Sequence, residues 1–198
     1  MPEKISRRDV LKSLGKGVLA GSVLRVIPLE AAEYAHKMIA SEKAASPKGT
    51  YTPKYFSATQ YKTVVALCQI IIPADSDSPG AVEAGAPEFI DLLTSENREY
   101  QLALGGGILW LDGACADRYG HPFIQCSAEQ QRQMLDSIAF RKHALTDPGL
   151  SQGIEFFAFL RNLTVDGFFT SAAGIKYLGY IGNAYLTEFT GCPPVPEL

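Results

Sequence analysis

An apolar stretch that runs into a short acidic loop constrains this chain more than any other feature. Residues 70–91 read IIIPADSDSPGAVEAGAPEFID. Proline lacks a backbone N–H and clashes with the preceding turn, so the helix that leads into this stretch must stop at Pro73. The Asp and Ser residues that follow favour turns, and Pro87 suits the first turn of another helix. The stretch therefore predicts two helices joined by a rigid acidic loop.

Helical signals recur along the rest of the chain, whereas the two-residue alternation typical of strands is weak. Ser57 with Gln60, and Ser127 with Gln130, each match a capping box. The helix after Ser127 is expected to end near His143. The length of 198 residues and the 46% hydrophobic composition suit one domain with a sizeable core. We expect a mostly α fold: a single compact helical domain with Gly- and Pro-rich loops, after an N-terminal export segment.

Three consecutive glycines interrupt another predicted helix. Ser95 suits its cap, the helix runs to about Arg118, and Gly105 to Gly107 lie in the middle. Each glycine weakens a helix by roughly 1 kcal/mol relative to alanine. The triplet therefore predicts either a break or a close approach by another backbone. A phosphate-cradling loop is the sharper alternative, but neither the G-x-G-x-x-G spacing nor a preceding strand is present.

The N-terminus resembles a twin-arginine export signal. Ser6–Lys12 reads SRRDVLK, so that Arg7 and Arg8 fall at the paired positions of the motif. The next segment is only moderately apolar and is interrupted by Lys16 and Arg25, which suits this route better than the general secretory one. An ordinary basic amphipathic helix is the alternative. We expect a targeting segment over residues 1–30, a helical spacer and linker over 31–50, and the helical domain over 51–198.

Composition and spacing argue against several classes of function. A formal net charge of −3 disfavours nucleic acid as a partner, because phosphate binding needs clustered Lys and Arg. No run of about 20 apolar residues predicts a transmembrane helix. The histidines His36, His121 and His143 lack a metal-ligand spacing, and the four cysteines lack C-x-x-C and C-x-x-C-H. We expect no catalytic, cofactor-binding or metal-binding residue in this chain.

One dense acidic group raises an alternative. Its members are Asp75, Asp77, Glu83, Glu88 and Asp91. Two such carboxylates can act as general acid and base, and Asp75 with Asp77 can begin a calcium loop, although the EF-hand continuation is absent. Turn formation and helix capping explain most of these residues. Two rival functions stay open: an independent periplasmic carbohydrate-active enzyme that uses the Asp75–Asp91 carboxylates, and a free periplasmic binding module.

Two sequence signatures carry a family resemblance. The first reads IIPAD, PGA, AG and FID between Ile71 and Asp91, and the second reads DGFFTS, G, LGY and GN between Asp166 and Asn183. In this order and spacing they resemble the gluconate 2-dehydrogenase subunit 3 family. Its members are small, non-catalytic subunits of membrane-linked, flavin-dependent sugar and polyol dehydrogenases. The resemblance covers residues from about 56 to 192.

The resemblance implies an accessory small subunit of a flavin-dependent sugar, sugar-acid or glycoside dehydrogenase. In such a complex a separate large subunit of the glucose-methanol-choline type carries FAD and the catalytic histidine, and a c-type cytochrome often takes the electrons. This chain would stabilise the large subunit and supply the export signal for both. The expected location is the periplasm, reached by the twin-arginine route, and the inner-membrane surface through the partners.

The second signature has the composition of an interface. Aromatic side chains are enriched at protein–protein contacts, and the glycines between them let backbones approach closely. An ordinary aromatic core with turn glycines is the alternative. The residues expected at the partner interface are Pro73, Asp75, Phe168, Phe169, Thr170, Tyr177, Tyr180 and Cys192.

The four cysteines allow more than one pairing. Cys68 is flanked by core-type residues and is expected to be a buried thiol. Cys115 and Cys126 border the connector over residues 119–125 and can pair across it. Cys192 is then left to bond or pack against the large subunit. The competing arrangement joins Cys192 to Cys115 or Cys126 within the chain.

Overall fold

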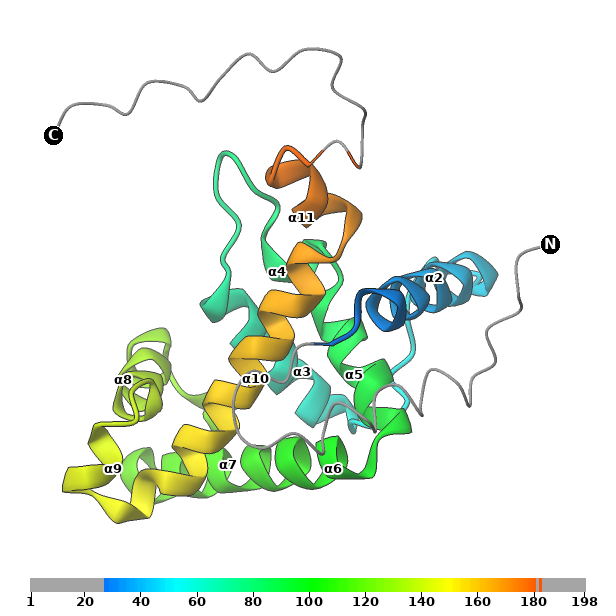
Figure 1. Ribbon diagram of the computed structural model, residues 1–198. Coiled ribbons are helices and arrows are strands. Elements are labelled where there is room, and N and C mark those ends of the chain that lie inside the picture. Colours follow the sequence, from blue (N-terminus) through cyan, green and yellow to red (C-terminus); the bar gives the residue numbers. More distant parts are fainter. Residues whose placement is uncertain (1–26, 181, 183–198) are drawn as a thin grey trace, which may run out of the picture.

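The computed structural model describes residues 27–180 and residue 182 (Figure 1). These residues form helices and loops, with no strand among them, which confirms the expected mostly α fold. The segment with Arg7 and Arg8 and the tail with Cys192 lie outside the described residues. No helix in the described part of the chain combines the length and hydropathy needed to cross a bilayer.

The described residues form a continuous series of helices and helical turns. In chain order these are α2 (Leu29–Ala45), α3 (Ala58–Ile71), α4 (Gly80–Glu83), α5 (Ala86–Glu96), α6 (Arg98–Tyr100), a π-helical segment (Gln101–Gly105), α7 (Gly106–Tyr119), a 3-10 turn (Phe123–Gln125), α8 (Ala128–Ile138), α9 (His143–Thr146), a second 3-10 turn (Pro148–Leu150), α10 (Ser151–Phe169) and α11 (Ala172–Tyr177).

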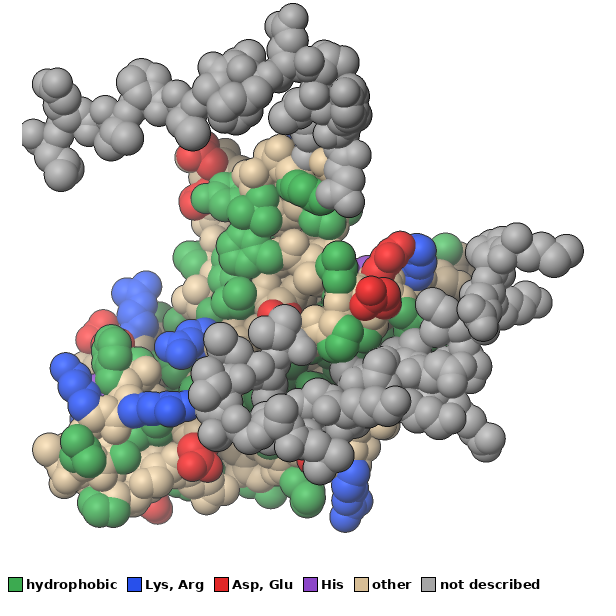
Figure 2. All heavy atoms as spheres, in the orientation of Figure 1, with side chains coloured by type: hydrophobic (Ala, Val, Ile, Leu, Met, Phe, Trp, Pro, Cys, Tyr) green, Lys and Arg blue, Asp and Glu red, His purple; other side chains and the backbone are tan. Residues whose placement is uncertain are grey.

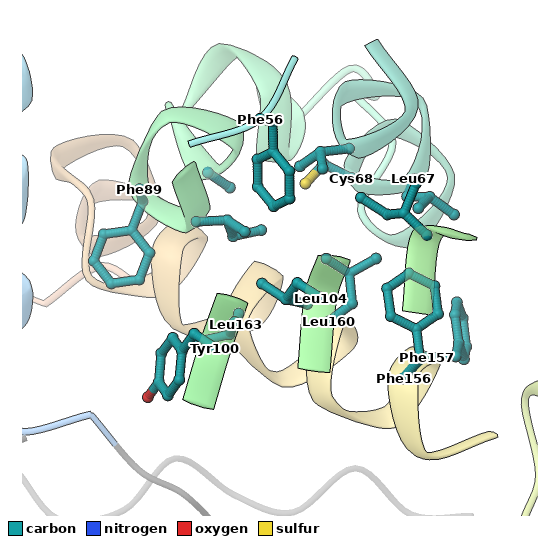
Figure 3. Close-up of a cluster of buried hydrophobic side chains, with 14 of the residues drawn as sticks. Phe56, Leu67, Cys68, Phe89, Tyr100, Leu104, Phe156, Phe157, Leu160 and Leu163 are labelled. Atoms are coloured by element: carbon teal, nitrogen blue, oxygen red, sulfur yellow. The ribbon is translucent and has the colours of Figure 1, made fainter. Parts of the chain in front are cut away.

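Helix α10 is the centre of the fold. It spans 19 residues, and α5 and α7 pack along it while α3, α4, α8 and α11 also contact it (Figure 1). Because neighbours enclose it on several sides, α10 is apolar around much of its circumference. Figure 3 shows the resulting hydrophobic cluster, whose labelled members are Phe56, Leu67, Cys68, Phe89, Tyr100, Leu104, Phe156, Phe157, Leu160 and Leu163.

Local capping signals set the ends of two helices as predicted. The Oγ of Ser57 accepts the N–H of Gln60, and the Oε1 of Gln60 accepts the N–H of Ser57, which completes a capping box on α3. Ser127 and Gln130 make the same pair of bonds at the start of α8. Helix α3 ends at Ile71, just ahead of the predicted proline stop.

The cap predicted at Ser95 is wrong. Ser95 lies inside the last turn of α5, and its Oγ donates to the carbonyl of Leu92 at 2.7 Å. The next helix is capped by Asn97, whose Oδ1 accepts the N–H groups of Glu99 at 2.9 Å and Tyr100 at 3.3 Å. Both Ser and Asn are good N-cap residues, and the extended backbone of Asn97 decides which one acts.

Helix α8 also ends earlier than the prediction near His143. It stops at Ile138, and a separate short helix, α9, begins at His143. The chain turns back between them, and Nδ1 of His143 lies 2.9 Å from the carbonyl oxygen of Ser137. A carbonyl that the helix end leaves unpaired therefore finds a side-chain partner.

The glycine triplet is a site of close contact and not a break. The helix continues from α6 through the π-helical segment into α7. A Cβ on Gly107 would lie 2.0 Å from Cδ2 of Phe156, and a Cβ on Gly105 would lie 2.6 Å from the Tyr55 hydroxyl. On the facing helix, a Cβ on Gly153 would lie 2.1 Å from the Trp110 ring. Aromatic side chains, and not another backbone, therefore occupy the space beside these glycines.

Helix α2 packs on the rest of the domain through small side chains. Ala31, Ala32, Ala35 and Ile39 are buried, and α2 contacts α5. An ion pair between Lys43 and Glu88 adds to this contact. The residues expected to form a spacer thus contribute to the hydrophobic core, because alanines allow close helix approach even where an apolar face is thin.

Candidate functional site

Asp91, the last residue of the first signature, is a completely buried carboxylate that accepts four hydrogen bonds. Its Oδ1 accepts the N–H groups of Tyr55 at 3.1 Å and Phe56 at 3.0 Å. Its Oδ2 accepts the Lys54 N–H at 2.6 Å and the Tyr51 hydroxyl at 2.8 Å. A buried charge is tolerated only when such donors replace water. Asp91 therefore anchors the segment that leads into α3.

The same contacts leave Asp91 unsuited to acid–base catalysis. The side chain has no exposed surface, and both oxygens are already engaged by donors of the same chain. Burial, followed by the charge and hydrogen bond of Asp91, raises the pKa of Tyr51 well above its ordinary value, so this phenol stays a proton donor. A catalytic pair of Asp75 and Asp91 is therefore not available to a substrate.

Asp75 shapes the exposed loop between α3 and α4. Its Oδ1 accepts the N–H groups of Asp77 at 2.8 Å and Ser78 at 2.7 Å, which is the turn-forming role predicted for it. The backbone N–H of Asp75 also donates to the carbonyl of Ser78 at 2.9 Å. Pro73 and Asp75 are both exposed. The loop is thus an ordered surface feature in which one carboxylate oxygen is used internally.

Gly80 closes the base of this loop. Its φ of +78° lies in the left-handed region, and a Cβ would stand 2.6 Å from the backbone nitrogen of Ala74. The N–H of Ala81 donates to the carbonyl of Ile72 at 2.9 Å. Only glycine fits both the backbone angle and the space. The P-G-A part of the first signature therefore serves the geometry of the loop.

His36 connects α2 to both signatures. Its ring stacks on Phe89 with centroids 5.0 Å apart, and its Nε2 lies 2.9 Å from the Thr170 hydroxyl oxygen. That hydroxyl donates its one proton to the carbonyl of Asp166 at 2.6 Å. It must therefore accept from His36, which places a proton on Nε2. Burial lowers the pKa of His36, so the neutral ring is favoured.

Asp166, the first residue of the second signature, has a partly buried carboxyl group whose surroundings disfavour the charged form. Burial raises its pKa to about 6. Its Oδ2 is buried and meets no hydrogen-bond partner within the described part of the chain. The protonated, neutral form of this carboxyl group is therefore favoured to a higher pH than in an exposed aspartate.

The residues after Asp166 divide between core and surface. Phe168 is 1% exposed and packs edge-on against Phe169 and Tyr177, so it belongs to the core and not to the expected partner interface. A Cβ on Gly174 would lie 2.1 Å from the carbonyl oxygen of Phe168. Ser171 caps α11 by accepting the N–H of Gly174 at 3.0 Å. This close packing fixes α11 on the end of α10.

The outer side of α11 carries large exposed apolar residues, which we call the α11 face. Its members are Ile175 (36% exposed), Tyr177 (52%), Leu178 (59%) and Tyr180 (57%). Figure 2 shows apolar side chains over the end of the molecule where Figure 1 places α11 and the loop before α4. Of the residues expected at the interface, Pro73, Asp75, Tyr177 and Tyr180 are exposed, and Phe169 and Thr170 are half-buried.

The described residues contain no group of three or more His, Cys, Asp and Glu side chains arranged to hold a metal ion. The side chains of Asp91, Asp75 and Thr170 in the two signatures instead bond to the chain itself. The site therefore consists of intrachain hydrogen bonds and, beside them, the exposed apolar α11 face.

This architecture is that of a helical domain whose two signatures meet around α5, α10 and α11. The family model for gluconate 2-dehydrogenase subunit 3 matches residues 58–187, well over half of the chain. The chain belongs to the gluconate 2-dehydrogenase subunit 3 family, and so to a family of dehydrogenase subunits. No curated protein and no solved structure matches it.

Two contacts of the site have no signal in the sequence. The Tyr51–Asp91 hydrogen bond joins residues 40 positions apart, and the His36–Thr170 hydrogen bond joins residues 134 positions apart. Neither pair falls in one motif. A lone histidine and a tyrosine in a loop are unremarkable until the packing of α2 and α5 brings their partners close.

Replacement of Asp91 by Asn should destabilise the fold strongly. Each oxygen of Asp91 accepts two hydrogen bonds. An amide nitrogen in place of either oxygen is itself a donor, so two donors of the chain would lose their acceptor. We expect a loss of about 2–4 kcal/mol in the free energy of unfolding, measured by urea titration. Asp75→Asn is the matched control, because its side-chain oxygen can still accept both loop N–H groups, and its change should stay within about 0.5 kcal/mol. Superimposable urea curves for Asp91→Asn and the unaltered chain would refute the anchoring role.

Replacement of Asp166 by Asn should stabilise the fold in a pH-dependent way. The folded-state pKa of about 6 lies above the ordinary value of 3.8, so the folded chain loses stability as the pH rises through 6. The variant should therefore gain about 1 kcal/mol at pH 7.5 and almost nothing at pH 4. His36 acts in the opposite direction, since its lowered pKa favours the fold above about pH 6.5. The difference between variant and unaltered chain at each pH isolates Asp166.

The control for net charge is Asp136→Asn, which removes an exposed carboxylate from α8. Urea titrations at several pH values supply the comparison. A gain for Asp166→Asn that is equal at pH 4 and pH 7.5 would contradict the assignment of the raised pKa to this carboxyl group.

Proposed function

We propose that this chain is the non-catalytic small subunit of an FAD-dependent sugar, sugar-acid or glycoside dehydrogenase. In this proposal it stabilises a catalytic large subunit of the glucose-methanol-choline type and carries the export signal for the complex. Membership of a family of dehydrogenase subunits supports the first part. The proposal places the complex in the periplasm, at the inner-membrane surface through its partners, with a c-type cytochrome as the electron acceptor.

The observation that carries the proposal is a contrast within the two signatures, between polar side chains that bond inside the chain and apolar side chains that are exposed. Two of their polar side chains hold the chain together: Asp91 binds the segment before α3, and Thr170 binds His36. The large exposed residues around the second signature are apolar and aromatic, as on the α11 face. Chemistry on a small molecule needs accessible polar groups, whereas association with a protein uses exposed aromatic and aliphatic side chains.

The described residues give no argument for an FAD site in this chain. The phosphates of dinucleotides usually bind where a glycine-rich turn joins a strand to a helix, and no strand occurs in the described ranges. Within the triplet at residues 105–107, Gly105 faces the side chain of Tyr55 and Gly107 that of Phe156, so the space beside these two glycines is filled. We therefore assign FAD and the catalytic histidine to the large subunit.

The α11 face is the surface that we assign to the large subunit. Tyr177 and Leu178 are more than half exposed although they are large and apolar, and they follow directly from the tightly packed Gly174 contact. An ordered backbone that presents aromatic and aliphatic side chains lowers the entropy cost of association. The exposed loop with Pro73 and Asp75 lies at the same end of the molecule in Figure 1.

The double change Tyr177→Ser and Leu178→Ser tests this assignment. We expect the tagged small subunit, co-expressed with its large subunit, to recover at least tenfold less flavin protein than the unaltered chain. Leu109→Ser with Leu145→Ser is the matched control, because both leucines are at least as exposed and lie on α7 and α9. Circular dichroism checks that both variants fold. Undiminished flavin recovery with the α11 variant would exclude this face as the docking surface.

Replacement of Arg7 and Arg8 by Lys tests the export part of the proposal. Twin-arginine export depends on the arginine pair, whereas an amphipathic basic helix keeps its charge when Lys replaces Arg. We expect both subunits to remain in the cytoplasm, measured by cell fractionation and flavin content. A large subunit that still reaches the periplasm in full would show that this chain does not supply the signal for the complex.

A further inference from the structure

Cys115 and Cys126 lie against each other under the connector between α7 and α8. Cys115 is completely buried on the last turns of α7, and Cys126 is 8% exposed and follows the 3-10 turn of residues 123–125. That turn packs against α7. The packing of the connector against α7 therefore makes Cys115 and Cys126 neighbours.

The connector is folded back on α7 by specific contacts. Gly120 ends α7 with a left-handed φ of +85°, and its N–H donates to the carbonyl of Ala116 at 2.8 Å. The N–H of Phe123 donates to Oδ1 of Asp112 at 3.1 Å, which ties the returning chain to a residue one turn before Cys115. Gln131 on α8 holds the other side by donating to the carbonyl of Phe123 at 3.0 Å.

The two sulfur atoms have no competing role in the fold. Apart from its contact with Cys115, the Sγ of Cys126 makes two long contacts, 3.6 Å to the carbonyl oxygen of Pro122 and 3.8 Å to that of His121. Burial raises the pKa of Cys115 to about 12, and the neighbouring Cys126 thiol raises it as well. Cys68 is a different case, because it lies between α3 and α10, 3.6 Å from the Thr164 hydroxyl.

We propose that Cys115 and Cys126 form an intrachain disulfide when the chain folds in the presence of a disulfide oxidant. The thiolate of Cys126, the more accessible of the two, attacks one sulfur of the oxidant and releases one reduced thiol. The Cys115 sulfur then displaces the second thiol from the mixed disulfide. The pair loses two electrons and two protons, and the oxidant is reduced to two thiols. Burial of Cys115 makes the bond form during folding and protects it afterwards.

This bond would fix the corner between α7 and α8. The closed loop is short, so its effect on the unfolded chain is moderate, equivalent to a rise of about 5–10 °C in the melting temperature for a chain of this size. The pairing does not depend on the proposed function, because oxidised glutathione can supply the electron acceptor in vitro.

The test uses the full chain, reduced and unfolded in guanidinium, then refolded in a mixture of oxidised and reduced glutathione. After denaturing alkylation with N-ethylmaleimide, we expect two adducts and not four, and before it a mass about 2 Da lower. Peptide mapping should join Cys115 to Cys126. Reduction should lower the melting temperature of the refolded chain, and Cys126→Ser should abolish both the cross-link and this shift. Cys68→Ser should keep both.

The same alkylation and mapping, applied to the chain isolated from its complex, covers the case in which the chain does not refold alone. Four alkylated cysteines in both samples would overturn the proposal. A cross-link from Cys115 or Cys126 to Cys192 or Cys68 would overturn it too, and it would support the competing intrachain arrangement in the case of Cys192.

Discussion

The buried carboxylate of Asp91 is the interaction on which the rest of the structure depends. Three backbone N–H groups and one phenol converge on it, and this fixes where residues 51–56 cross α5. The position of that segment decides where α3 begins and where Phe56 enters the core. It also brings the Tyr55 hydroxyl to the carbonyl of Gln101 at 2.9 Å, on the π-helical segment. One charge thus orders three helices, because leaving any of its lone pairs unmatched in the interior would cost more than a neutral contact of the same size.

Among the predicted contacts, the structure confirms those whose two partners lie within one helical turn of each other. The capping boxes at Ser57 and Ser127 depend on residues three positions apart, and both formed. The choice between Ser95 and Asn97 failed because both residue types cap helices, and the backbone angle that decides is set by the packing of α5. The glycine triplet marks a close approach, but by the side chains of Tyr55 and Phe156 and not by the predicted backbone. These residues are about 50 positions away in either direction, so their identity had no local signal. The anchoring role of Asp91 was hidden for the same reason.

Each of the two signature segments contains both buried residues that hold the fold together and residues that are exposed at the surface. In the second signature Gly167 and Phe168 pack inside while Tyr177 and Leu178 point outward. In the first, Asp91 is buried while Pro73 and Asp75 are exposed. A chain with this pattern cannot change its surface without regard to its core, because both are built from the same short segments. The paired titrations of His36 and Asp166, which oppose each other in sign, lie where these segments meet α2 and α10.

Helices α7 and α10 each place an aromatic ring beside a glycine of the other helix, and this arrangement restricts how the two helices can move. Phe156 of α10 fills the space above Gly107, and Trp110 of α7 fills the space above Gly153. A slip of either helix by one residue would drive a ring into a neighbouring side chain, so the two helices move as one rigid body. Trp110 is the only tryptophan of the chain. Its fluorescence therefore reports on the contact between these two helices. The signal should change when the centre of the domain opens and stay constant when only the α11 end moves.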